Sequence, residues 1–261
     1  MRRLWILVAL ALLVSAAGLV RAQDLDGMAI MKKVADREES KSSETETKMI
    51  LVDNRGQQRE RSLIVRAKQI NKRDHVMTTF LSPPDVRGVK FLVIENPTGD
   101  DDQRIYLPAI KRARRISSSQ KSGSFMGSQF SYEDLQSQDP EKYKHQRMAD
   151  MQMAGHDCYV VQSVPLDPSD TQYSKAIWWV RKDAWVPIRA ELYDKKGNLL
   201  KVLEVQELEK QPDGTWLTKL TKMSDVQQRK VTIMQIIKYQ ANVQIKDSVF
   251  TERFLTDESQ E

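Results

Sequence analysis

The sequence predicts a mainly β protein with a single, strongly curved antiparallel sheet that forms an incomplete (half) β-barrel, and a few α-helices as its lid. Runs rich in β-branched and aromatic residues follow one another from residue 46 to residue 242, and turn sequences separate them at regular spacing. Only short, isolated stretches have the apolar periodicity of a helix. A closed barrel needs no helices, so we expect them to cover the apolar inner face of a barrel that stays open.

The first 22 residues have the features of a cleaved signal peptide. Two arginines precede the apolar run 4–14, and Val20-Arg21-Ala22, with small residues at positions 20 and 22, provides a cleavage site before Gln23. No cysteine lies directly after the apolar run to carry a lipid, so a soluble product secreted into the periplasm is expected. The alternative is an uncleaved membrane anchor, but the run is shorter than the roughly 20 residues that a span needs.

The charge of the chain gives little support to nucleic-acid binding. The formal net charge of +5 falls to +2 in the mature chain, because three of the 41 cations lie in the first 22 residues. A nucleic-acid interface needs a broad basic face, and none is expected here. What remains is one local cluster, which contains Lys111, Arg112, Arg114, Arg115 and Lys121.

The mature chain, residues 23–261, is predicted to form one domain. Its length permits one or two domains, but no internal repeat or Pro/Gly-rich linker divides it. Cys158 is the only cysteine and has no intrachain partner, so stability must come from an apolar core. We expect a monomer.

The first third of the mature chain predicts a helix followed by a hairpin. Apolar residues fall on one helical face of residues 24–39, and two aspartates lie near the N-terminal end of that helix. The arms of the hairpin, 46–52 and 59–70, flank the turn sequence Asp53-Asn54-Arg55-Gly56. A further strand, 75–81, ends before two prolines.

The strand expected at residues 88–95 differs from these, because both of its faces are largely apolar. Phe91 belongs to one face, and Leu92 and Ile94 belong to the other. We therefore expect another part of the chain to cover this region of the sheet.

The rest of the chain is expected to continue as a meander with one helical interruption. Strands at 103–108 and 110–116 precede a Gly/Ser-rich loop, and Ser131 with Asp134 fits the S-x-x-[DE] pattern that starts a helix, predicted over residues 132–138. The later strands are predicted at 147–153, 158–165, 175–181, 187–193, 199–208, 215–225 and 230–242.

No catalytic, metal or cofactor site is expected, and the chain is not predicted to be an enzyme. His156 and Cys158 are the only His and Cys residues close together, with His145 as a conceivable third ligand, whereas structural zinc sites need four. A small buried cysteine is the better interpretation. The serines between residues 117 and 128 lack a GxSxG elbow or a phosphate-loop motif, and a mobile loop explains them better.

Aromatic residues and methionine are the candidates for an apolar ligand site. The alternative is that they form an ordinary core. Trp178 and Trp179 are adjacent in a strand and must point to opposite faces, so at most one of them lines a cavity. The candidate cavity and lid residues are Phe91, Tyr106, Phe125, Met126, Phe130 and Trp179.

Four arginines are candidates for polar contacts with a ligand or a partner: Arg104, Arg112, Arg114 and Arg115. Such a cation could meet a lipid phosphate or ester carbonyl, an acidic protein, or an anionic membrane surface. The alternative is a wet edge strand that Lys and Arg protect from aggregation.

One stretch resembles a known family. Arg104, Tyr106 and Pro108, followed by the basic run and by SGSFMGSQFSYEDL at residues 122–135, resemble the signature of the outer membrane lipoprotein-sorting proteins, relatives of the LolA carrier. The resemblance implies a half-barrel with a helical lid over a cavity for acyl chains. It also implies an association with RND-type inner-membrane exporters or with an outer-membrane acceptor.

The function predicted is that of a periplasmic carrier or chaperone for lipid or lipoprotein acyl chains, with residues 122–128 as the hinge of its lid. Each buried methylene contributes about 0.8 kcal/mol, so holding an acyl chain needs no catalytic residue. The alternative is a LolA-like sensor or adaptor that transports nothing and binds a membrane protein through the surface at residues 111–121.

Overall fold

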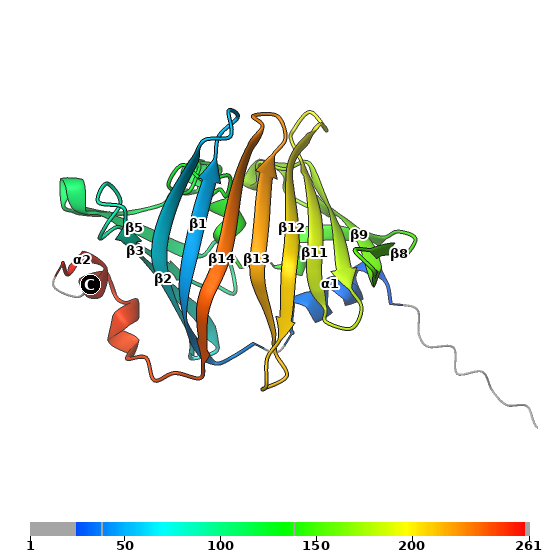
Figure 1. The fold of residues 1–261 in the computed structure, drawn as a ribbon. Helices are drawn as coiled ribbons and strands as arrows, with labels where there is room; N and C mark the ends of the chain where they lie inside the picture. Colours follow the sequence, from blue (N-terminus) through cyan, green and yellow to red (C-terminus); the bar gives the residue numbers. More distant parts are fainter. Residues whose placement is uncertain (1–24, 38, 138, 259–261) are drawn as a thin grey trace, which may run out of the picture.

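The computed structural model describes residues 25–37, 39–137 and 139–258, and the predicted signal peptide lies outside these residues. The described chain forms one open antiparallel sheet of 14 strands, strongly curved, as predicted (Figure 1). None of the helices in these residues is long and apolar enough to cross a membrane.

The strands are close to the predicted ranges but more numerous. The helices of the described residues are α1 (Gly27–Ala35) and α2 (Glu252–Thr256), with short 3-10 turns elsewhere. The strands are β1 (Ser42–Val52), β2 (Gln58–Ile70), β3 (Arg73–Ser82), β4 (Lys90–Ile94), β5 (Asp102–Leu107), β6 (Arg112–Arg115), β7 (Tyr143–Arg147), β8 (Met151–Met153), β9 (His156–Pro165), β10 (Lys175–Arg181), β11 (Val186–Tyr193), β12 (Leu199–Lys210), β13 (Trp216–Asp225) and β14 (Lys230–Ala241).

The strand order brings the first and last strands together in the middle of the sheet. One meander runs from β1 outward to β6, the other from β14 outward to β9 and β7, and β1 pairs with β14. The two edges of the sheet, β6 and β7, are therefore consecutive in sequence. The chain between them, residues 116–142, must cross the sheet, and we call it the bridging segment; residue 138 within it lies outside the described part.

Successive residues of the bridging segment contact successive strands across the sheet. The Met126 carbonyl accepts a hydrogen bond from Arg61 of β2, and Gln129 is hydrogen-bonded to Thr232 of β14. Farther along, Asp134 pairs with Lys201 of β12. The face that this segment covers is the inner face of the curved sheet, and the opposite one is the outer face.

The inner face is filled over β1 to β5 and less tightly over β9 to β13. Over the first half, Phe125 and Tyr132 of the bridging segment pack with Phe80 and Phe91 in a cluster of buried rings. Phe125 is only 4% exposed and Phe91 only 2%. This half of the sheet holds a solid core.

The C-terminal segment covers the outer face of β3 to β5, which explains why both faces of β4 are apolar. Phe250, Phe254 and Leu255 pack against Leu92 and Tyr106. The predicted cover over this part of the sheet is thus supplied by residues 247–256, beside the sheet in Figure 1.

Helix α1 lies on the inner face beside the edge strand β7. Its N-cap is Asp26, whose carboxylate accepts a hydrogen bond from the Ala29 amide at 2.7 Å. Its apolar side turns Ile30, Met31 and Val34 toward β9 and β10. The amphipathic helix predicted here is confirmed, although it is shorter than residues 24–39.

The prediction of a second helix over residues 132–138 is wrong. Only a 3-10 turn forms, Glu133–Leu135. The Ser131 hydroxyl accepts a hydrogen bond from the Asp134 amide, as in a helix start, but the Asp134 carboxylate also bonds Lys201 and Tyr173. These tertiary bonds hold the chain across the sheet, so the helix does not continue.

Candidate ligand cavity

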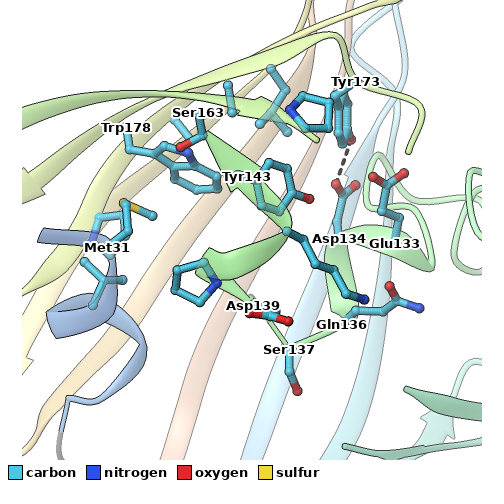
Figure 2. A pocket seen from close by; sticks show the side chains of 18 of the residues that line it. Met31, Glu133, Asp134, Gln136, Ser137, Asp139, Tyr143, Ser163, Tyr173 and Trp178 are labelled. Carbon is cyan, nitrogen blue, oxygen red and sulfur yellow. Dashed lines mark hydrogen bonds between the residues drawn. The ribbon is translucent and has the colours of Figure 1, made fainter. Parts of the chain in front are cut away.

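A cavity of about 250 Å³ lies over the second half of the sheet. Its floor is the inner face of β9 to β13, and its cover consists of α1 and the bridging segment from Phe130 to Lys142 (Figure 2). The cavity exists because the large rings of the bridging segment, Phe125 and Tyr132, fill the other half of the sheet.

The strand register explains why one row of the floor is apolar. Trp178 of β10 faces Val161 on one side and Ala190 on the other, and Ala190 faces Leu203. Leu203 in turn faces Met223 of β13. Side chains opposite one another across strands share a face, so this row forms an apolar strip beneath the cover.

The next row, two residues along each strand, carries polar groups. It contains His145, Ser163, Ala176, Leu192 and Lys201 in register across β7 to β12. The floor of the cavity is therefore apolar beside α1 and mixed toward the bridging segment.

Asp134 ties the cover to this polar row. Its carboxylate accepts hydrogen bonds from Lys201 Nζ at 2.8 Å, Tyr173 Oη at 2.6 Å, and both the amide and the hydroxyl of Ser131 at 2.7 Å. The Asp134 and Lys201 side chains are 7% and 8% exposed. Burial and the neighbouring Asp134 charge raise the pKa of Tyr173 well above its ordinary value, so its hydroxyl remains a donor.

A second ion-pair group closes the polar end of the cavity. Lys121 Nζ bonds the carboxylates of Asp100 and Asp170. Burial alone would lower the pKa of Lys121, but these hydrogen bonds outweigh it and raise the pKa above its usual value. Lys121 is therefore charged, and its ion pairs link the bridging segment to the two loops that carry Asp100 and Asp170.

His145 and Tyr143 of β7 line the cavity beside α1. His145 Nε2 lies 2.9 Å from the Pro140 carbonyl, so it must carry a proton, and Nδ1 accepts from the Ser163 hydroxyl at 2.8 Å. Burial lowers the pKa of His145. Burial, reinforced by the charges of acidic neighbours such as Glu133, raises the pKa of Tyr143 to about 12, so its hydroxyl is neutral.

The structure separates the two adjacent tryptophans as expected but places the other one in the cavity. Trp178 lines the cavity. Trp179 lies on the outer face with Cys158 and Val160, and its Nε1 donates to Met151 Sδ at 2.9 Å. Alternation along β10 could not reveal which face is inner, because the two faces carry the same aromatic residue at adjacent positions.

Only Phe130 of the six predicted cavity residues lines the cavity. Phe91, Phe125 and Met126 lie in the filled half of the inner face. Tyr106, like Trp179, is on the outer face, where its hydroxyl donates to Glu258. The loop predicted as a hinge carries Phe125 and is anchored by the same core.

None of the four predicted arginines lines the cavity. Arg104 and Arg115 lie at one position of the β5–β6 ladder, and both pair with Asp102. Arg104 also pairs with Glu252 of α2. Arg112 and Arg114 are exposed on β6, which is an edge strand of the sheet.

Sequence reasoning missed four lining residues, Trp178, Tyr143, His145 and Asp134, and the ion-pair partner of Asp134, Lys201. The one available signal was the Ser131–Asp134 pattern, which marked a polar anchor but was interpreted only as a helix start. The ion pair joins residues 67 positions apart, and local patterns do not reveal such contacts.

The described residues offer no cluster for metal chemistry. They contain no group of three or more His, Cys, Asp or Glu side chains that could hold a metal ion. Cys158 is buried in β9, its thiol donates to the His156 carbonyl, and burial raises its pKa. What the arrangement can do is enclose an apolar group next to several polar groups, some of them charged.

Solved structures with the same architecture and substantial sequence identity place the chain in a family. A domain assigned to the outer membrane lipoprotein-sorting proteins of Vibrio parahaemolyticus is 33% identical, with a TM-score of 0.83 over 88% of this chain and 98% of that one. The chain belongs to the outer membrane lipoprotein-sorting protein family. A DUF1329 family protein from Desulfovibrio piger is 31% identical, with a TM-score of 0.83 over 88% of this chain and 97% of that one.

Other comparisons agree on the fold. A LolA superfamily protein from Nitrosomonas europaea has a TM-score of 0.69 at 18% identity, over 88% of this chain and all (100%) of that one. A protein-family model described as "-like: Uncharacterized protein" matches residues 72–257. No curated protein matches the chain. The half-barrel resemblance seen in residues 104–135 thus extends to the whole described fold.

Proposed function

We propose that this lipoprotein-sorting family member is a periplasmic carrier that holds an acyl chain of a lipid or lipoprotein and catalyses no reaction. The observation that carries the proposal is the covered cavity over β9 to β13, with its apolar floor. A cavity of 150 Å³ is enough for a small apolar molecule such as benzene, so about 250 Å³ suits a segment of one chain better than two whole chains.

The sequence and the family support the rest of this proposal. A signal peptide over residues 1–22 would deliver the mature domain, residues 23–261, to the periplasm. The name of the 33% identical relative concerns lipoprotein sorting. The family resemblance also supports hand-off of the cargo to an RND-type exporter or an outer-membrane acceptor.

Lipid content and cavity filling test the carrier together. The mature protein is purified from an envelope fraction, extracted with organic solvent and analysed by mass spectrometry, and uptake of a fluorescent fatty acid is measured. Ala190→Leu fills part of the apolar row of the floor. It should reduce uptake by about tenfold or more, because the larger side chain takes the space of one or two methylene groups of the bound chain. Ala67→Leu is the matched control, since Ala67 of β2 is half-buried and does not line the cavity.

Two results would contradict the carrier. One is purified protein without extractable lipid and without fatty-acid uptake. The other is equal uptake by the Ala190→Leu and wild-type proteins at equal stability, which would place any lipid outside the cavity.

The exposed edge strand β6 favours a second candidate function, a sensor or adaptor for a membrane protein. Edge strands present unpaired backbone groups, and Arg112, Arg114 and Arg115 add positive charge to this one. An acidic partner would then bind in a salt-dependent manner. The double change Arg112→Glu/Arg114→Glu should abolish crosslinking to one fixed partner in cells, whereas a carrier with the same changes should keep its lipid.

A further inference from the structure

Trp178 places an unused hydrogen-bond donor at the apolar end of the cavity. Its indole Nε1 is buried, and in the part of the chain that the structure describes it is the one buried side-chain nitrogen or oxygen without a hydrogen-bond partner. A buried donor without an acceptor destabilises the protein, so such an atom in a cavity calls for an explanation.

The neighbouring tryptophan shows that the fold can supply an acceptor to an indole. Trp179 Nε1, one residue away on the outer face, donates to Met151 Sδ at 2.9 Å. Trp178 instead lies between Val161 and Ala190 in its row, and neither side chain can accept a hydrogen bond.

The cover next to Trp178 is able to adjust. Met31 of α1 lines the same cavity and belongs to the buried cluster against which Trp178 packs (Figure 2). Methionine has three rotatable bonds and tolerates changes in its surroundings. Movement of one side chain can therefore uncover the indole N–H to a group inside the cavity.

The charges around the cavity disfavour an anionic acceptor. Five carboxylates line it, against the ammonium groups of Lys121, Lys142 and Lys175. Four of these carboxylates contribute to the raised pKa of Tyr143 in the same wall: Glu133, Asp134, Asp139 and Asp170. Lys201 balances Asp134, and Lys121 balances part of the charge of Asp100 and Asp170. The acidic groups still outnumber the lysines, so an added carboxylate is disfavoured. A neutral oxygen meets no such repulsion.

From these observations we propose that Trp178 Nε1–H is the polar anchor of the cavity and donates to the neutral carbonyl oxygen of an ester- or amide-linked acyl chain. This inference rests on the proposed carrier function and names its ligand class. The apolar row holds the chain, and the indole selects acyl groups over hydrocarbons without a carbonyl. Free fatty acids still bind through their chain, but more weakly than the esters.

Equilibrium dialysis with three radiolabelled probes tests the anchor: methyl palmitate, palmitic acid and hexadecane. Wild-type protein should bind methyl palmitate most tightly. Trp178→Phe removes the N–H but keeps an aromatic ring, so it should weaken methyl palmitate binding about fivefold and leave hexadecane unchanged. Trp179→Phe is the matched control and should leave binding of all three probes unchanged.

A second measurement observes the bond itself. In the protein labelled with ¹⁵N-indole, methyl palmitate should shift the Trp178 N–H resonance downfield, and hexadecane should not. Three results would overturn the anchor but leave the carrier intact. They are an equal loss of affinity for all three probes in Trp178→Phe, no loss of affinity for any probe, and a Trp178 N–H resonance that does not shift. Palmitic acid binding more tightly than its ester overturns the proposed selection for a neutral carbonyl. Failure of the wild-type protein to bind any probe overturns the carrier as well.

Discussion

Asp134 is the residue on which the cover of the cavity most depends. Its carboxylate accepts four hydrogen bonds, and its ion pair with Lys201 is almost fully buried. Removing one partner of a buried pair leaves an uncompensated charge, which costs more than the pair itself contributes.

We expect Asp134→Ala to lower the free energy of unfolding by about 3–5 kcal/mol, because Lys201 and Tyr173 lose their acceptor. Urea denaturation measures the change. The matched control is Glu46→Ala, whose partner Lys238 lies 3.3 Å away in a pair about half exposed, at 51% and 55%. Its cost should be below about 1 kcal/mol. Equal costs for the two variants would show that Asp134 is not a special anchor.

His145 should make the protein less stable in mild acid. Its pKa in the folded state lies below the ordinary 6.5, chiefly because of burial, so the unfolded chain binds a proton first as pH falls. The contribution of neutral His145 is complete above about pH 6.5 and declines as the pH drops from there toward the folded-state pKa.

His145→Gln should flatten this part of the curve, since glutamine does not titrate. Unfolding free energies of both proteins, measured from pH 7.5 to pH 5, check the prediction. Parallel curves for the two proteins would mean that His145 contributes nothing to the pH dependence.

At the scale of elements, α1 depends on a close backbone approach. A methyl group added to Gly27 would lie 2.9 Å from the Arg147 amide nitrogen, which belongs to the backbone of β7 and cannot turn away. Gly27→Ala should therefore displace α1 and cost about 1–3 kcal/mol. It should also weaken fatty-acid binding, because α1 forms one wall of the cavity.

Thermal unfolding and binding of a fluorescent fatty acid measure the two effects of Gly27→Ala. Gly56→Ala is the control, since no atom lies within 4 Å of the added methyl group and only the positive φ of +80° is strained. That variant should lose stability but keep its affinity. Unchanged binding in Gly27→Ala would remove α1 from the site.

For the whole molecule, the contacts of the cover indicate which part opens. The bridging segment is held by the hydrogen bonds of Gln129 to the buried Thr232 and by the buried ion pair of Asp134, whereas the ion pair of α1, Lys32–Glu141, is exposed. A helix of nine residues is also too short to be stable by itself. We therefore assign opening to α1 and not to the loop at 122–128.

Hydrogen exchange checks this assignment. Amides of α1 should exchange faster than those of the paired strands β1 and β14, and methyl palmitate should slow the exchange of α1. The amides of residues 131–135 should change little. Faster exchange at 131–135 than in α1 would reverse the roles of the two parts of the cover.

The sequence was informative wherever a local pattern decides the structure. The hairpin turn at Asp53 formed as expected, because its carboxylate bonds the amides of Arg55 and Gln57 and Gly56 accepts a positive φ. The two apolar faces of β4 correctly indicated that other parts of the chain cover this region of the sheet. The site was less predictable, since Phe130 was identified and Trp178 was not.

Alternating apolar residues, turn sequences and one amphipathic helix were sufficient for the half-barrel class, and the motif at residues 104–135 indicated the family. These features act between near neighbours in the chain, so a single sequence reveals them. The tertiary structure decided the rest, through the pairing of β1 with β14 and the crossing of residues 116–142. These two features determine which face of each strand is inner and where the rings of the bridging segment leave a cavity. They also bring Lys201 to Asp134. Such contacts between distant residues exist only once the whole sheet has formed.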